Sequence, residues 1–254
     1  MPNIPTSCIG IVQARISSQR FPGKVLAPIL GKPLLLYLLE RLSRSKHLSE
    51  VVVATSTEPS DDPLELFCKE QGVRCYRGSL IDPSARIAEA LMDKAQNQQI
   101  KNQSSYSYFA RICGDSPLYD ADVLDRAIEI AVENRLDIAT NVNPRSYPKG
   151  QSVEIIRTQF FLDELPKITS LDDREHVTRA FYRGLIPAKY ENLSCPEGDL
   201  SQINFCVDYQ EDLLRIQKIL AKLAKPHVEC NTAELISLYR ELEESARKSE
   251  TGEQ

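Results

Sequence analysis

The stretch CIGIVQARISSQRFPGKVLAPIL, residues 8–30, decides the fold because it joins a strand to a basic loop. CIGIVQ, residues 8–13, is an almost unbroken apolar run, which is typical of a strand covered on both faces. Residues 14–24 then bring arginines, a lysine, serines and a Pro-Gly pair together. In a parallel sheet flanked by helices, ligands bind beyond the carboxyl ends of the strands. The loop therefore stands where a ligand is expected.

The chain from residue 33 to residue 140 alternates between strand-like and helical patterns. Strand-like runs cover 50–55, 73–77, 106–112 and 136–140, and helical apolar spacing covers 33–45, 62–72, 84–96 and 120–135. This alternation indicates βαβ units. Asp62 and Asp120 suit helix N-termini, where backbone N–H groups need an acceptor. We predict an α/β fold with three layers, Rossmann-like, around a mostly parallel mixed sheet.

A polar loop at 141–151 breaks this alternation. After it we expect strands at 153–156 and NFCV (204–207), a charged segment at 171–184, and helices at about 209–223 and 231–247. No internal repeat or low-complexity linker divides the chain. We predict one domain over 1–247 with an inserted excursion at about 141–195, followed by a disordered tail at 248–254.

Composition excludes several classes of partner. With 254 residues, 42% of them hydrophobic, the chain can bury a full core. A net charge of −5 argues against nucleic acid and anionic membranes as partners, because both require an excess of Lys and Arg. The seven cysteines form no CxxC pair, and no run of about 18 apolar residues occurs. We expect a cytoplasmic protein.

The basic loop has the chemistry of a polyphosphate cradle. Arg15, Arg20 and Lys24 supply cations, neighbouring serines supply hydroxyl donors, and Gly23 permits close backbone approach. The glycine spacings of a Walker A loop and of GxGxxG are absent. The alternative interpretation is an ordinary solvated basic loop.

Two aspartates follow apolar strand-like runs. RICGDSPLYD (111–120) places Asp115 after one run, and NFCVDYQED (204–212) places Asp208 after another. Carboxylates that converge from separate strand ends form a reasonable Mg²⁺ site, because this ion takes oxygen ligands and is completed by waters and phosphates. Either aspartate alone could instead be a helix N-cap.

These motifs resemble the SpsF-like cytidylyltransferases, relatives of the enzymes that make CMP-activated 3-deoxy-manno-octulosonate and CMP-acylneuraminate. The resemblance is carried by VQARISSQRFPGKVL (12–26), VVVATSTEPSDD (51–62), RICGDSPL (111–118), REHVT (174–178) and VDYQEDL (207–213). It implies a GT-A-like nucleotidyltransferase fold. The implied reaction transfers CMP from CTP to a sugar acid and releases pyrophosphate, in cell-surface polysaccharide biosynthesis.

The resemblance also implies residue roles. Arg15, Arg20 and Lys24 would stabilise charge at the α-phosphate, and Asp115 and Asp208 would hold Mg²⁺. Contacts to the nucleotide are expected from Ala14, Ser17, Ser18, Thr55, Ser56, Arg77, Gly78 and Gly114. Candidates for binding the anionic acceptor are Asn141, Arg145, Tyr147, Arg174, Glu175 and His176.

The chain departs from the family pattern at two places. Residues 17–19 are Ser-Ser-Gln where relatives have Gly and then Ser-Thr, and Ala85 replaces an acidic residue while Arg86 remains. A changed acceptor is the expected consequence. Relatives suggest a homodimer built through 141–195, and the apolar residues 160–162 could serve it or could pack on their own sheet.

Two other functions remain open. One is a GT-A glycosyltransferase that uses a finished nucleotide sugar, although no DxD lies between the central strands. The other is a non-catalytic nucleotide-binding protein, against which the retained basic and acidic residues argue.

Overall fold

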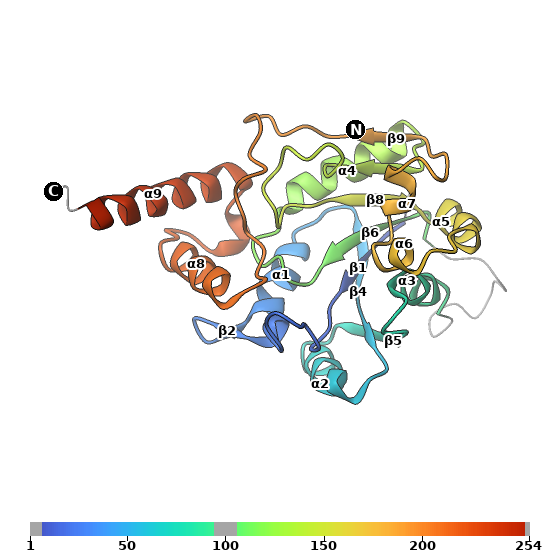
Figure 1. Cartoon of the computed structure of the whole chain (residues 1–254), viewed down its shortest axis with the longest axis horizontal. Coiled ribbons are helices and arrows are strands. Elements are labelled where there is room, and N and C mark those ends of the chain that lie inside the picture. The colour runs from blue at the N-terminus through green and yellow to red at the C-terminus, as the bar shows by residue number, and fades with distance from the viewer. Residues whose placement is uncertain (1–6, 94–105, 252–254) are drawn as a thin grey trace.

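A computed structural model places residues 7–93 and 106–251, and its centre is a mixed sheet with helices on both faces (Figure 1). The strand order in this seven-stranded sheet is β5-β4-β1-β6-β8-β7-β9. Neighbours are parallel except where β8 runs antiparallel to β6 and β7. The strands are β1 Cys8–Gln13, β4 Leu48–Ser56, β5 Arg74–Gly78, β6 Tyr108–Cys113, β7 Ile138–Thr140, β8 Glu154–Arg157 and β9 Tyr190–Asn192.

The helices form the outer two layers. The face toward α1, α2 and α4 buries Cys8 and Val12, whereas the face toward α3, α5 and α7 buries Ile9 and Ile11. Alternate side chains of β1 thus enter different clusters, as the two-residue period of a strand requires. The helices are α1 Leu34–Leu42, α2 Asp62–Glu70, α3 Pro83–Met92, α4 Ala121–Glu133, α5 Thr158–Glu164, α6 Leu171–Glu175, α7 Arg179–Tyr182, α8 Gln210–Ala221 and α9 Thr232–Thr251.

A third apolar cluster lies beside the sheet. It joins the hairpin β2 (Pro28–Ile29) and β3 (Lys32–Pro33) to α8 and α9, with Phe205 at 0% exposure in its middle. Short 3₁₀ turns complete the chain at Lys24–Leu26, Pro59–Asp61, Leu165–Lys167 and His227–Glu229. This arrangement confirms the three-layer α/β prediction. No helix within 7–93 or 106–251 is long and apolar enough to span a membrane.

Two expectations differ in detail from the structure. NFCV (204–207) is not a strand; only an isolated bridge pairs Asn204 with Lys149. The segment cannot join the centre of the sheet, because β6 is already bonded on both sides, to β1 and to β8. The last helix continues to Thr251, so residues 248–251 are helical and not part of a tail. Of the helix expected at 84–96, residues 94–96 lie outside the described residues.

The segment 141–195 contributes to the main sheet. It supplies β8 and β9, and its helix α5 packs Phe161 against Phe109 of β6 with ring centroids 5.1 Å apart. Phe160 is 7% and Phe161 0% exposed, so both belong to the core of one chain. The dimer surface that residues 160 and 161 might have formed is therefore not available on them.

Candidate active site

The basic loop is anchored by Asp61, a buried residue at the start of α2. Its Oδ1 accepts the backbone N–H of Ile16 at 2.7 Å, and its Oδ2 accepts the N–H of Ser56 at 3.0 Å as well as the Ser56 hydroxyl. Burial by itself would raise the pKa of Asp61, but the hydrogen bonds from Ser56 and Ile16 outweigh it and hold the pKa below its ordinary value. An ionised carboxylate thus ties the loop after β1 to the end of β4.

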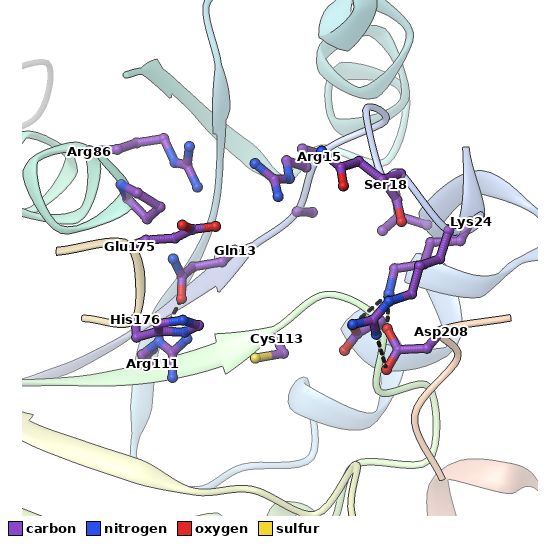
Figure 2. Close-up of a pocket in the computed structure, with 16 residues that line it drawn as sticks. Gln13, Arg15, Ser18, Lys24, Arg86, Arg111, Cys113, Glu175, His176 and Asp208 are labelled. Atoms are coloured by element: carbon purple, nitrogen blue, oxygen red, sulfur yellow. Dashed lines mark hydrogen bonds and ion pairs between the residues drawn. The ribbon is translucent and has the colours of Figure 1, made fainter. Parts of the chain in front are cut away.

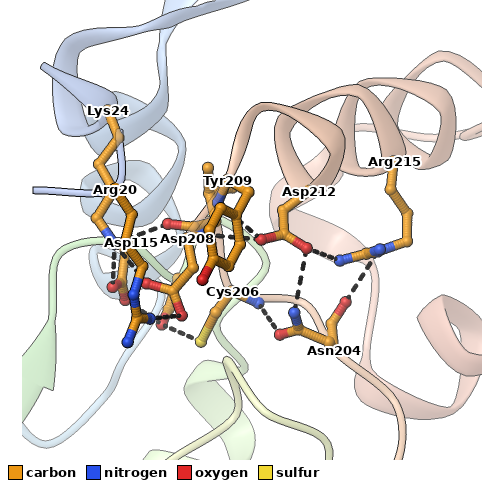
Figure 3. A network of polar contacts seen from close by, with 11 residues as sticks. Arg20, Lys24, Asp115, Asn204, Cys206, Asp208, Tyr209, Asp212 and Arg215 are labelled. Carbon is orange, nitrogen blue, oxygen red and sulfur yellow. Dashed lines mark hydrogen bonds and ion pairs between the residues drawn. The ribbon is translucent and has the colours of Figure 1, made fainter. Parts of the chain in front are cut away.

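Lys24 stands between the two predicted acids (Figure 3). Its Nζ lies 2.8 Å from Asp115 Oδ2, 3.0 Å from Asp208 Oδ1 and 2.8 Å from the carbonyl oxygen of Val207. Burial would lower the pKa of Lys24, but the charges and hydrogen bonds of Asp115 and Asp208 outweigh it and raise the pKa. The predicted cation and both predicted acids therefore meet at one point.

Asp115 reaches this point because Gly114 brings the end of β6 against β1. The Gly114 N–H donates to the Gln13 carbonyl at 2.8 Å, and a Cβ at position 114 would lie 2.8 Å from the Cβ of Ala14. A larger residue would push the two strand ends apart. Gly114 is thus a spacing residue for the site.

Asp208 is placed by hydrogen bonds rather than by a strand. The N–H of Val207 donates to the Asp115 carbonyl at 2.9 Å, and Asp212 in the first turn of α8 accepts the N–H groups of Asp208 and Tyr209, each at 2.9 Å. Gly150, with a φ of 90°, lets the loop at 141–151 pass so close to this segment that a Cβ there would lie 2.7 Å from the Phe205 carbonyl carbon.

A cavity of about 360 Å³ opens beside this cluster (Figure 2). Nine residues assigned to the site from the sequence line it: Ala14, Arg15, Ser18, Arg20, Lys24, Asp115, Glu175, His176 and Asp208. The other lining residues, for which the sequence predicts no site role, are Gln13, Gln19, Val25, Pro83, Arg86, Arg111 and Cys113.

Arg86 is a cation in the wall of the cavity that forms no ion pair with the described residues. It is 3% exposed, its Nη1 donates to the Ser79 carbonyl at 2.7 Å, and its Nε has no partner. No acidic side chain of the described residues forms an ion pair with it. Burial, followed by the positive charge of Arg15, lowers the pKa of Arg86 to about 10. The charges of Asp61 and Asp82 offset this only in part, and a buried cation without a direct ion pair favours an anionic ligand.

Several residues expected at the nucleotide lie behind the cavity instead. Ser17 is exposed and does not line it, and Thr55 and Ser56 are both 0% exposed. Arg77 donates to the Ser56 carbonyl at 2.9 Å and pairs with Glu65 at 2.7 Å. Gly78 likewise does not line the cavity, and its carbonyl accepts the N–H of residue 57 at 3.0 Å. These groups brace the end of β4 and the anchor of the basic loop.

The acceptor candidates divide in the same way. Glu175 and His176, at the end of α6, line the cavity, whereas Arg174 pairs with Asp82 at 2.8 Å. The three candidates from the loop at 141–151 are used to brace that loop. Asn141 is buried and bonds to the backbone of residues 151 and 153, Arg145 donates to Ser152 at 3.0 Å, and Tyr147 is 7% exposed within the third apolar cluster.

Comparison with known proteins identifies the family. A family profile described as "Cytidylyltransferase" matches residues 9–244. This chain belongs to the cytidylyltransferase family. The spore coat polysaccharide biosynthesis protein SpsF of Bacillus subtilis is 31% identical to this cytidylyltransferase over 94% of this chain and 97% of its own length. A 3-deoxy-manno-octulosonate cytidylyltransferase of Bdellovibrio bacteriovorus is 32% identical over 59% of this chain and 56% of its own.

Solved structures agree with the family assignment. A cytidylyltransferase from Leptospira borgpetersenii serovar Hardjo-bovis has a TM-score of 0.83 and 28% identity, covering 94% of this chain and 96% of that chain. A CMP:2-keto-3-deoxy-manno-octonic acid synthetase complexed with CTP has a TM-score of 0.62 at 15% identity, covering 85% of this chain and 99% of that chain, and so shows a shared fold alone. The resemblance to the SpsF-like family is confirmed, and so is the enzyme class, a CTP-dependent nucleotidyltransferase.

Proposed function

We propose that this cytidylyltransferase transfers CMP from CTP to a sugar acid, releases pyrophosphate and serves the synthesis of a cell-surface polysaccharide. The observation that carries the proposal is the meeting of Lys24 with Asp115 and Asp208 in the wall of a cavity that also holds Arg15 and Arg86. Cations of this density suit a polyphosphate, and the relatives' names supply the sugar-acid class and the polysaccharide.

The proposed reaction is an in-line displacement at the α-phosphorus of CTP. A hydroxyl oxygen of the acceptor forms the new P–O bond and loses its proton to solvent, the bond to the bridging oxygen breaks, and pyrophosphate leaves with the electron pair. Arg15, Arg20 and Lys24 would bind the triphosphate and stabilise its growing charge, since phosphoryl transfer is accelerated mainly by positioning and electrostatic stabilisation. No covalent intermediate with the protein is required.

We further propose that Asp115 and Asp208 hold Mg²⁺, and the donor set fits this ion. Oxygens of both carboxylates lie within 3.0 Å of one cationic nitrogen, so they already converge on a single positive charge. Within 7–93 and 106–251, no group of three or more His, Cys, Asp or Glu side chains could hold a metal. Two carboxylates completed by water and phosphate oxygens are a common magnesium arrangement. When bound, the ion would neutralise phosphate charge.

The homodimer and the cytoplasmic location stay predictions.

The test incubates the enzyme with CTP, Mg²⁺ and a panel of octulosonic and nonulosonic acids. We expect pyrophosphate release and a CMP-sugar product, with UTP in place of CTP as the control for base preference. Release without any acceptor, or none with every acceptor, would contradict the proposal. Transfer from a preformed nucleotide sugar would favour a glycosyltransferase, and tight CTP binding without turnover would favour a non-catalytic protein.

A further inference from the structure

A second set of titratable side chains lies at the end of the cavity opposite Lys24 and Asp208. Figure 2 shows Arg111 and His176 there, on the far side from the two-acid cluster. Arg111 projects from β6, and its Nε donates to Oε1 of Gln13 on β1 at 2.6 Å. Its Nη1 donates to Glu154 Oε2, and Nη2 has no hydrogen bond to the described residues. The guanidinium is therefore held on two sides and can serve a ligand with the third nitrogen.

Glu154 on β8 is the acidic partner that holds this guanidinium in place. It is 4% exposed, and the register of β6 and β8 sets it directly opposite Arg111. Its other oxygen, Oε1, accepts the Thr178 hydroxyl at 2.6 Å and the Tyr182 hydroxyl at 2.7 Å. Burial would raise the pKa of Glu154, but the charge of Arg111 and these hydroxyl donors hold it below its ordinary value. The carboxylate is thus ionised and fully occupied inside the fold.

The same carboxylate also secures the turn that carries His176 into the cavity. Thr178 follows Val177, whose φ of 55° is a left-handed conformation that costs energy for a β-branched residue. The side chain of Val177 is 0% exposed, so packing and the Glu154–Thr178 hydrogen bond oppose relaxation of the turn. Backbone strain of this kind persists only where its surroundings enforce it.

We propose that Glu154 is a positioning residue for acceptor recognition: it fixes Arg111 and the turn at 175–178 so that Arg111 binds a carboxylate on the acceptor. The inference rests on the proposed function, because it assigns the acceptor's anionic group to one end of the same cavity. With Nε and Nη1 engaged, the guanidinium can still donate a charge-assisted hydrogen bond from Nη2 to a carboxylate of the acceptor. The triphosphate of CTP then occupies the Lys24 end of the cavity, so Lys24 and Arg111 bind the two anionic substrates separately.

The kinetic test compares wild type, Glu154→Gln, Arg111→Gln and the double variant, with 3-deoxy-manno-octulosonate and N-acetylneuraminate as acceptors. Glu154→Gln keeps the shape of the side chain but removes its charge. We expect it to raise the acceptor KM by roughly 10- to 100-fold, as loss of a charge-assisted hydrogen bond does, and the CTP KM by less than about twofold. The double variant should raise the acceptor KM by clearly less than the product of the two single effects, because part of the effect of Glu154 passes through Arg111.

A matched control separates positioning from general stability. Asp137→Asn breaks another arginine–carboxylate pair, that of Asp137 with Arg157 of β8. The side chain of Asp137 is 17% exposed. It should leave the acceptor KM within about twofold of wild type. If Asp137→Asn raises the acceptor KM as much as Glu154→Gln does, or if Glu154→Gln raises both KM values equally, the inference is wrong.

A binding measurement tests, without any turnover, whether Arg111 binds the acceptor and whether Glu154 supports this binding. The side-chain Nε–H resonance of Arg111 is assigned by its loss in Arg111→Gln and followed by NMR while each of the two acids is added. We expect a saturable shift in wild type and a titration midpoint roughly 10-fold higher or more in Glu154→Gln. A shift without pyrophosphate release would contradict the proposed function but support the inference. No shift with either acid, or equal midpoints in both proteins, would overturn the inference.

Discussion

At the scale of single residues, Lys24 has the most direct electrostatic role because it contacts both acids of the site. Its side chain is 10% exposed, so water screens its charge only weakly. We expect Lys24→Ala to lower kcat by roughly 10²-fold or more, as removal of one group that stabilises transition-state charge does, and Arg15→Ala to act in the same direction. Pyrophosphate release under saturating CTP measures both. Wild-type turnover in either variant would show that the loop does not bind the reacting phosphates.

Arg86 allows a second residue-scale prediction, in which stability and activity change in opposite directions. Arg86→Met removes a buried charge whose burial outweighs the attraction of Asp61 and Asp82, so we expect the ligand-free protein to gain about 1–3 kcal/mol in the free energy of unfolding while its affinity for CTP falls. Urea unfolding and CTP titration measure the two effects.

The matched control for Arg86 is Arg41→Met. Arg41 is also 3% exposed, but its guanidinium donates to the carbonyl oxygens of Tyr119, His227 and Cys230. Its removal leaves buried acceptors unpaired, so Arg41→Met should destabilise the fold by about 2–4 kcal/mol. Equal destabilisation by both substitutions would mean that Arg86 is a structural residue only.

Some residues predicted for the site from their positions after strands meet in the structure. Lys24 and Asp115 could be assigned because the carboxyl ends of parallel strands share one edge of a sheet. Arg111 could not, because it lies within a strand and its access to the cavity depends on Glu154, a partner 43 residues later. Asp61 could not either, because its hydrogen bond to Ile16 is formed only when the loop folds back over α2.

At the scale of elements, the basic loop depends on Asp61 for its shape. Asp61→Asn should lower the free energy of unfolding by about 1–3 kcal/mol, because the amide cannot replace an ionised acceptor of several hydrogen bonds, and it should raise the KM for CTP. The pKa of Asp61 is below its ordinary value of 3.8, so its stabilising effect is present above that pH and is lost as the pH falls through the lowered value.

The pH dependence provides the measurement. As the pH falls from 3.8 through the lowered pKa of Asp61, the stability of wild type should fall more steeply than that of Asp61→Asn, and the two free energies of unfolding should approach one another. Parallel curves over this range would show that the Asp61 carboxylate does not stabilise the loop.

Segment 204–207 shows where element prediction fails and why. Its apolar residues predict a strand, yet Phe205 and Val207 are buried in the third apolar cluster rather than in the sheet. Apolar alternation indicates that residues are buried but does not show which element covers them. Burial against α8 and α9 therefore gives the same pattern as burial in a sheet. The prediction of Asp208 was still useful, since Val207 is hydrogen bonded to Asp115.

At the scale of the whole molecule, the site depends on a helix that does not touch it. Tyr239 of α9 packs against Phe205 with ring centroids 5.9 Å apart, and Phe205 lies three residues before Asp208. We expect Tyr239→Ala to cost about 1–3 kcal/mol of stability and to lower turnover several-fold, because the segment that carries Asp208 loses its support. The exposed neighbour Arg240→Ala should change stability by less than about 0.5 kcal/mol. Unchanged turnover in Tyr239→Ala would show that the segment is held without α9.

The joining of Lys24 to Asp208 has a consequence for how the enzyme is made. A ribosome releases the N-terminal end first, so β1 and its basic loop emerge long before the acid at position 208. A nascent chain must therefore keep a cationic loop without its second partner until most of the polypeptide has been translated. Catalytic competence arrives late in synthesis, and prematurely terminated chains that stop before α8 should carry no activity of their own.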